Sequence, residues 1–187
     1  MRYYPILLDL KGKECVVVGG GSVAQRKVYA LLKAGARVKV ISPKLTKGLR
    51  ELKKKKKIAC LSSTYTKGSL QDAFLVIAAT NSQVTNKQVA LDAASRGSLI
   101  NVVDASVLSN FIVPSVIAKK DLIISISTSG KAPCLSKRIR KDLEKLLVPE
   151  YAIFLSRLKE IRGNIKLRCL NAKQKAQVLH SLVEAKV

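Results

Sequence analysis

The sequence predicts an α/β fold built on a parallel sheet. Short apolar segments alternate with helical ones from residue 14 to residue 103, which is the pattern of strands joined by helical crossovers. The segment Phe74–Ala79 is apolar throughout, as a strand is when helices cover both faces of its sheet. Three consecutive glycines, at 19–21, join the first strand to the first helix. The 48% of hydrophobic residues is enough to form a core.

Local signals place each element of this sheet. Apolar runs predict five strands, at Glu14–Val18, Val38–Ile41, Ile58–Tyr65, Phe74–Ala79 and Leu99–Val103. Helical periodicity predicts three helices, at Val23–Ala34, Leu45–Lys57 and Gln83–Arg96. Gly35 and Gly97 stand where a glycine commonly ends a helix.

The pattern changes after residue 111. Ile112–Ala118 and Leu122–Ser127 predict two strands joined by a tight polar turn. A helix is expected from Pro133 to about Leu147, and residues 150–187 are basic and predicted to be helical. We therefore expect a sheet domain at residues 1–112, a small α+β region of hairpin plus helix at 113–149, and a helical C-terminal segment at 150–187.

The net charge of +23 favours anionic partners. The charge is spread along the chain, with +13 in residues 1–113 and +10 in residues 114–187. The dense run Lys53–Lys57 is interpreted as a solvated helix end, since only 4% of residues are aromatic and none is Trp. No apolar run reaches the roughly 20 residues that span a bilayer, and the apolar stretch near the N-terminus is too short for a signal peptide. We expect a cytoplasmic protein.

Cysteine and histidine give no metal-binding pattern. Cys15, Cys60, Cys134 and Cys169 lie far apart in the sequence, and His180 is the only histidine. Cys15 lies inside a predicted strand and is expected to be a small core residue. No metal site is predicted.

The glycine turn is the strongest local motif. Gly19 to Ala24 reads G-x-G-x-x-A and runs from a predicted strand into a predicted helix. Gly19 permits a tight turn, Gly21 lets a pyrophosphate approach the backbone, and Ala24 lets the helix pack closely on the sheet. The N–H groups of Ser22 and Val23, at the start of the helix, then face the phosphates. This context predicts dinucleotide binding, whereas the simpler interpretation is an ordinary glycine-rich turn.

The choice between NAD and NADP stays open in the sequence. The acidic residue expected at the end of the second strand is absent, and Ser42-Pro43-Lys44 stands there instead. Ser42 has a hydroxyl for a ribose, and Lys44 tolerates a 2′-phosphate.

Ligands of such sheets lie beyond the carboxyl ends of the strands. Thr80 and Asn81 follow the fourth predicted strand and are expected to line the cofactor site. Asp104 follows the fifth and is the only acid between Asp92 and Asp121. It is therefore a candidate catalytic residue, with a turn or helix-cap aspartate as the alternative.

Several segments together resemble the precorrin-2 dehydrogenase family, the dehydrogenase domain of siroheme synthases. They are YYPILLDLKGKECVVVGGGSVAQRKVYALLKAGARVKVISP, LVIAATN, NVVDASVLSNFIVPS and ISISTSGKAPCLSKRIRKDLE, within residues 3–150. The resemblance implies a Rossmann-like domain and NAD-dependent oxidation of precorrin-2 to sirohydrochlorin, on the route to siroheme. It also implies a homodimer in which the region after the Rossmann-like domain, here 113–149, is the dimerisation region.

The resemblance also implies roles for particular residues. Asp104 corresponds to the catalytic acid/base, and the segment Ser127, Thr128, Ser129 and Gly130 lies near the tetrapyrrole site. Precorrin-2 carries many carboxylates, so Lys131 and Arg138, with Lys137 and Arg140, are candidate partners for them. Many members have an aspartate where this chain has Asn110, so this chain lacks the second carboxylate that those members carry.

Three other functions remain open at this point. A bifunctional enzyme would also insert iron into sirohydrochlorin at the same site, with Asp104 taking the pyrrole protons. A nucleotide-sensing module would bind the dinucleotide without any chemistry. Binding to nucleic acid rests on charge alone and predicts an affinity that falls steeply with salt.

Overall fold

The computed structural model describes residues 2–146, 160 and 171–184. The chain forms two compact units, Met1–Val113 and Pro114–Val187. We describe each unit by itself. The predicted further division at residue 149 lies outside the described residues and stays a prediction.

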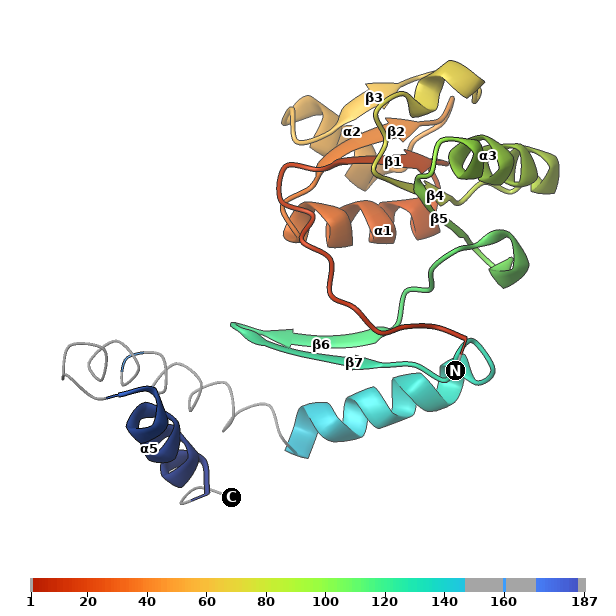
Figure 1. The fold of residues 1–187 in the computed structure, drawn as a ribbon. Coiled ribbons are helices and arrows are strands. Elements are labelled where there is room, and N and C mark those ends of the chain that lie inside the picture. Colours follow the sequence, from red (N-terminus) through yellow and green to blue (C-terminus); the bar gives the residue numbers. More distant parts are fainter. Residues whose placement is uncertain (1, 147–159, 161–170, 185–187) are drawn as a thin grey trace. The chain divides into compact units, whose positions relative to one another are not determined.

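The first unit contains one five-stranded parallel sheet (Figure 1). Its strands are β1 (Glu14–Val18), β2 (Arg37–Ile41), β3 (Ala59–Leu61), β4 (Leu75–Ala78) and β5 (Leu99–Val102), in the order β3-β2-β1-β4-β5. This order confirms the predicted α/β fold. The chain moves outward from β1 to β3 and then returns to the other side of β1. The strand order therefore reverses between β1 and β4, where open α/β sheets bind their ligands.

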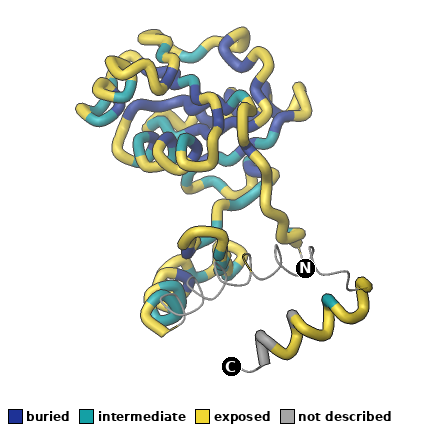
Figure 2. Tube along the Cα trace, turned by 90° about the vertical axis from the view of Figure 1, so that its left-hand side faces the viewer, coloured by how far each residue is buried: buried dark blue, intermediate teal, exposed yellow. Residues whose placement is uncertain are grey.

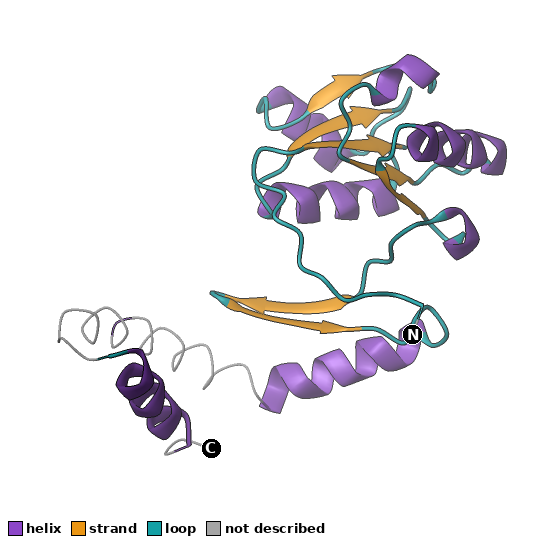
Figure 3. Ribbon diagram, viewed as in Figure 1, coloured by secondary structure: helices purple, strands orange, loops and turns teal. Residues whose placement is uncertain are grey.

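Helices cover both faces of the sheet (Figure 3). Helices α1 (Ser22–Lys33) and α2 (Lys47–Lys54) contribute buried residues to a core cluster on one face. Helix α3 (Gln83–Ser95) and the 3₁₀ turn η1 (Lys67–Leu70) contribute to the cluster on the other face. Figure 2 shows that burial is concentrated along the strands between these layers. All four residues of β4 are buried because helices cover the sheet on both faces.

Cys15 confirms its predicted place in the core. Its side chain is fully buried in β1, between α1 and the neighbouring strands. Burial raises the pKa of the Cys15 thiol to about 11, and the charge of Glu14 adds to the effect. The thiol is therefore neutral at physiological pH and acts as a small apolar side chain.

Three predicted elements differ from the structure by two residues or more at one end. Helix α2 begins at Lys47, where the predicted helix began at Leu45, because the Thr46 side chain caps it by accepting a hydrogen bond from the Leu49 N–H. It ends before Lys56, whose φ of 52° is incompatible with a helix. Strand β3 covers 59–61 of the predicted 58–65 because β2 offers pairing partners only up to Ile41. The strand predicted from residue 112 begins at residue 115, after Pro114, which has no N–H to donate.

The second unit contains the predicted hairpin. Strands β6 (Ser115–Lys119) and β7 (Leu122–Ile126) pair in antiparallel register. A helix covers residues 133–146, as expected, and helix α5 covers Ala172–Glu184. Within the described parts of the chain, no helix is long and apolar enough to cross a membrane.

Candidate functional site

The glycine turn is held against two neighbouring loops. Gly19 has a φ of 126°, and a Cβ built on it would lie 2.3 Å from the Ala79 carbonyl oxygen at the end of β4. A Cβ on Gly20 would lie 1.9 Å from the carbonyl oxygen of Lys44, in the loop after β2. Both neighbours are backbone atoms, so neither can move aside easily. Only glycine fits at these two positions.

The start of α1 is open to a ligand. Gly21 is the N-cap residue of α1 and provides no side-chain cap, and a Cβ on it would meet nothing within 4 Å. The first N–H groups of a helix have no partner within the helix, and the helix dipole favours an anion there. The first turn of α1 holds no acidic residue. The predicted cofactor residues Gly21, Ser22 and Val23 thus form a site that fits a pyrophosphate.

Ser42, Pro43 and Lys44 lie beside this turn, as predicted. The Ser42 hydroxyl is nearly buried and donates a hydrogen bond to the Lys44 carbonyl oxygen at 2.7 Å. Its hydrogen is therefore engaged, and toward a ribose hydroxyl Ser42 can act only as an acceptor. Pro43 and Lys44 are exposed.

Thr80 and Asn81 follow β4 at the same edge of the sheet. The Thr80 hydroxyl donates to the side-chain oxygen of Asn86 at 2.7 Å, and the Asn86 amide donates back to the Thr80 carbonyl oxygen at 3.0 Å. The Thr80 N–H also points to Asn86, at 3.2 Å. Asn86 therefore fixes the end of β4 next to the glycine turn, while Asn81 is exposed.

Asn86 was not predicted from the sequence. It is buried on α3 together with Val89, Ala90 and Ala93. A polar residue within the apolar stripe of a helix is the signal that marks it, because a buried amide requires hydrogen-bond partners.

Asp104 follows β5 and is exposed. The registers that align Val18 with Ala78, and Ala78 with Val102, bring the ends of β1, β4 and β5 level with one another. The glycine turn, Thr80 and Asp104 therefore share the carboxyl edge of the sheet. Asp104 has a φ of 61°, in the left-handed region, which aspartate adopts more readily than most residues other than glycine.

Two side chains hold the loop that carries Asp104 against β5. The Ile100 N–H donates to the Asn110 side-chain oxygen at 2.8 Å, and the Asn110 amide donates to the Ser98 carbonyl oxygen at 3.1 Å. The buried Ser109 hydroxyl accepts from the Val102 N–H at 2.9 Å. Asn110 thus completes the hydrogen bonds of the sheet edge, which accounts for an amide at this position.

The segment Ser127–Gly130 lies in the second unit, between β7 and the helix over 133–146. Ser129 and Gly130 both have a positive φ, of 55° and 81°. The Thr128 hydroxyl accepts from the Ala132 N–H at 3.1 Å and lies 3.2 Å from the Ser136 hydroxyl. These bonds fix the turn ahead of the helix.

The predicted basic partners lie at and after this turn. Arg138 donates through Nε to Asp142 at 3.0 Å, which leaves its two Nη groups for a further carboxylate. Arg140 pairs with Glu144 at 2.7 Å. Lys131 is exposed.

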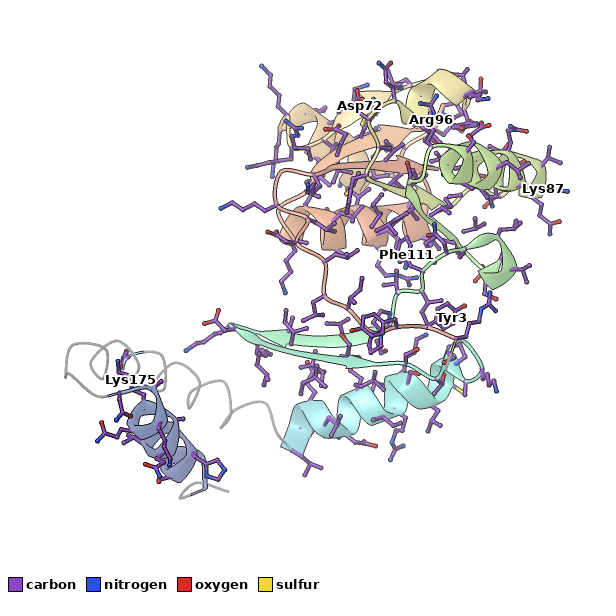
Figure 4. All side chains as sticks on the ribbon, viewed as in Figure 1. Tyr3, Asp72, Lys87, Arg96, Phe111 and Lys175 are labelled. Atoms are coloured by element: carbon purple, nitrogen blue, oxygen red, sulfur yellow. The ribbon has the colours of Figure 1, made fainter. Side chains whose placement is uncertain are left out.

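A shallow groove lies at the opposite, amino edge of the sheet. It is lined by Lys13, Glu14, Arg37 and Asp72, among others, and Arg37 pairs with Glu14 at 3.2 Å. Asp72 is labelled in Figure 4. Because ligands of α/β sheets bind at the carboxyl ends of strands, this groove is not the cofactor site. Among the described residues, no three of His, Cys, Asp and Glu are grouped to hold a metal ion.

Two family models match the chain. Residues 6–115 match a family described as putative NAD(P)-binding. Residues 120–146 match a family described as sirohaem biosynthesis protein central. The first match covers the sheet and every proposed cofactor residue, and the second covers the turn at 127–130.

Curated relatives and a solved structure agree with these matches. The chain is 39% identical to the siroheme synthase of Nitrosococcus oceani over 90% of its length, and 42% identical to that of Photobacterium profundum over 90%. It spans about a third of these relatives, 36% and 35% of their lengths. The structure of SirC, a precorrin-2 dehydrogenase, superposes with a TM-score of 0.86 at 29% identity, over 97% of this chain and 89% of SirC. These matches confirm the resemblance carried by the sequence motifs.

Proposed function

Because the chain belongs to the putative NAD(P)-binding family matched by residues 6–115, we propose that it is an NAD-dependent precorrin-2 dehydrogenase. It oxidises precorrin-2 to sirohydrochlorin, on the route to siroheme. The observation that carries the proposal is the similarity to SirC over 97% of this chain, which includes both units. The siroheme synthases it matches support the same assignment.

The carboxyl edge of the sheet binds the cofactor in this proposal. The N–H groups at Gly21, Ser22 and Val23 hold the pyrophosphate, and the open space at Gly21 admits it. Ser42, Pro43 and Lys44 border the adenosine ribose. Thr80 and Asn81 line the path toward the nicotinamide, with Thr80 held in place by Asn86.

Asp104 is the proposed catalytic residue. Bound NAD⁺ would supply the hydride acceptor for this oxidation. The carboxylate of Asp104 accepts the proton that is lost as the conjugated system extends, so that one hydride and one proton leave the substrate together. Its exposure at the end of β5 leaves the carboxylate accessible to a substrate.

The second unit binds the tetrapyrrole in this proposal. Precorrin-2 is a polycarboxylate, and Lys131 and Arg138 supply cations beside the turn formed by Ser127, Thr128, Ser129 and Gly130. The planar guanidinium of Arg138 suits a second carboxylate through its Nη groups.

The decisive experiment is anaerobic turnover of enzymatically generated precorrin-2 by the wild type and by Asp104→Asn, followed by absorbance. General base catalysis contributes about 10²–10⁴-fold, so we expect kcat to fall by that factor while the Kd for NAD⁺ is retained. Asp72→Asn is a matched control, since Asp72 is also an exposed aspartate with a φ of 61°. It lies at the opposite edge of the sheet and should turn over like the wild type.

Wild-type turnover by Asp104→Asn would remove the catalytic role of Asp104. If the wild type binds the dinucleotide but never forms sirohydrochlorin, the sensing module is the better description. Adding Fe²⁺ or Co²⁺ after sirohydrochlorin has formed tests the bifunctional alternative in the same cuvette. No acceleration over the spontaneous rate of insertion would exclude it.

We also propose that the protein is a homodimer that assembles through the hairpin. A two-stranded sheet is marginal in water on its own. Ile117 is buried on one face, whereas Val116 and Ile123 on the other are 42% and 49% exposed. A second copy covers this apolar face in our proposal.

We propose a cytoplasmic location, which is consistent with the free thiols among the described residues. Cys15, Cys60 and Cys134 are all free, as expected in a reducing compartment.

A further inference from the structure

The amino edge of the sheet carries a group of cations that the proposed reaction does not use. One groove there is lined by Lys13, Arg37 and Lys39. A second groove at the same edge shares Arg37 with the first and is also lined by the lysines that precede β3, namely Lys53, Lys56 and Lys57. The two grooves together hold these six cations and two acidic residues, Glu14 and Asp72. We call this set the amino-edge surface.

Most of the positive charge of the amino-edge surface is not compensated within the chain. Glu14 is paired with Arg37 at 3.2 Å. Among the residues that the structure describes, no ion pair involves Lys39, Lys56 or Lys57. A cluster of exposed cations of this kind attracts an anionic partner at long range.

Arg37 and Phe74 supply the contacts that protein interfaces commonly use. The Arg37 side chain is 73% exposed and pairs with Glu14 through Nε, which leaves its two Nη groups for a carboxylate of another molecule. Phe74, in the first groove, is 36% exposed. Arginine and phenylalanine are both enriched in the contact areas between proteins. The surface therefore combines positive charge with an apolar contact.

The end of α2 places a lysine where glycine is usual. The Lys57 N–H donates to the Leu52 carbonyl oxygen at 3.0 Å, and the Lys56 N–H donates to the Lys53 carbonyl oxygen at 3.0 Å. This pair of bonds ends a helix with a residue in the left-handed conformation, and Lys56 has a φ of 52°. Glycine adopts that conformation at lower cost. The backbone gives no reason for a lysine at position 56, and what the residue adds is a charge on the second groove.

The side chains of the surface favour an acidic protein segment over nucleic acid. Phe74 is the one aromatic residue that lines either groove, and the Lys13 ammonium lies over its ring, 5.3 Å from the centroid. That face of the ring is covered, so a base has little aromatic surface on which to stack. The carboxylates of Glu14 and Asp72 would repel a continuous phosphate backbone. A peptide, by contrast, has N–H groups that can donate to Asp72.

We infer that the amino-edge surface docks an acidic segment of a second protein. The surface lies at the edge of the sheet opposite the proposed cofactor site, so docking does not compete with binding of a dinucleotide. The inference goes beyond the proposed function and does not depend on which substrate the protein uses.

The test measures the binding of a fluorescein-labelled oligoglutamate peptide to the full chain by fluorescence anisotropy at low ionic strength. Lys13→Glu/Lys57→Glu reverses one exposed lysine in each groove. Repulsive charges then replace attractive ones, so we expect the Kd of the peptide to rise about tenfold or more.

Lys47→Glu/Lys87→Glu is the matched control. Both positions are exposed lysines of the first unit outside the two grooves, at the start of α2 and on α3, and Lys87 is labelled in Figure 4. This variant lowers the net charge by the same amount, and we expect the Kd to change by less than about threefold because salt screens distant charges. An equal rise in the two double variants would assign binding to net charge and overturn the inference.

Lys56→Gly keeps the test free of folding defects. It removes one charge of the surface and places glycine in a left-handed conformation that suits it, so the urea midpoint should be retained or raised. The Kd of the peptide should nevertheless rise, by about twofold or more. An unchanged Kd in Lys56→Gly and in Lys13→Glu/Lys57→Glu would overturn the inference.

Two further outcomes would also overturn it. The first is a wild type that binds oligoglutamate no more tightly than a neutral peptide of the same length. The second is a duplex DNA that binds more tightly than oligoglutamate at the same salt concentration and loses its affinity in Lys13→Glu/Lys57→Glu. That result would identify nucleic acid as the ligand of this edge.

Discussion

The packing of the glycine turn can be tested by adding a single methyl group. Gly20→Ala places a Cβ against the Lys44 carbonyl oxygen, so the loop after β2 must shift. We expect the free energy of unfolding to fall by about 1–3 kcal/mol, as in other overpacked sites, together with the affinity for NAD⁺. Urea unfolding and nucleotide titration measure the two effects.

Gly21→Ala separates the loss of stability from the loss of affinity for NAD⁺. Its Cβ meets no protein atom within 4 Å, and its φ of −81° suits alanine. Stability should therefore be retained, while the methyl group occupies the space proposed for the phosphates and weakens NAD⁺ binding. A Gly21→Ala variant that unfolds as readily as Gly20→Ala would contradict this account of the turn.

Asn110 allows a test of how the edge of β5 is held. Asn110→Asp keeps an acceptor for the Ile100 N–H but loses the donor to the Ser98 carbonyl oxygen, which would then face a carboxylate. Because Asn110 is exposed and this bond is part-buried, its loss should lower the free energy of unfolding by about 0.5–1.5 kcal/mol, and the urea midpoint with it. The same substitution at Asn81, which is also exposed but is not part of this edge, should change the free energy of unfolding by less than about 0.5 kcal/mol. Equal effects at the two positions would exclude a special role for Asn110 at this edge.

The sequence predicts best the elements whose ends are marked by neighbouring residues. Strand β1 has the predicted bounds, because an apolar run ends at glycines. Strand β3 is shorter because its length depends on where β2 ends, which no local pattern records. Tyr65, at the end of the predicted strand, instead donates its hydroxyl to the buried Asp92 at 2.7 Å. The burial and this bond raise the Tyr65 pKa.

The residues of the candidate site also differ in how well the sequence predicts them. The glycine turn and Asp104 could be located because their neighbours in sequence define a strand end. Asn86 and Ser109 could not, because each bonds a residue six or seven positions away, across the junction between a strand or helix and a loop. A hydrogen bond across such a junction leaves no periodic trace in the sequence. Polar residues within apolar stripes are the one indirect sign.

The apolar face of the hairpin predicts self-association. Ile123→Lys adds a charge to that face and should convert a dimer into a monomer, as measured by light scattering after size-exclusion chromatography. Leu91→Lys is the control, since Leu91 on α3 is 55% exposed and comparable in size. It should remain a dimer. A monomeric wild type would remove the proposal of a homodimer.

The net charge of +23 also affects the equilibrium between monomer and dimer. Two copies repel each other at long range, and salt screens that repulsion. We therefore expect the dimer to become tighter as ionic strength rises, opposite to the salt dependence of binding an anionic cofactor. Comparing the mass at low and high salt distinguishes an apolar interface from one held by ion pairs.

The closed edge of β5 has a consequence for how the protein behaves at high concentration. An open sheet exposes rows of unpaired N–H and C=O groups that can recruit strands from other molecules and begin fibril growth. At β5, an incoming strand would have to displace Asn110 and Ser109 from Ile100 and Val102. At the opposite edge, β3 offers only the three residues Ala59–Leu61, and five lysines precede it in the sequence. Both borders of the sheet are thereby protected against aggregation, one by hydrogen bonds and the other by shortness and charge.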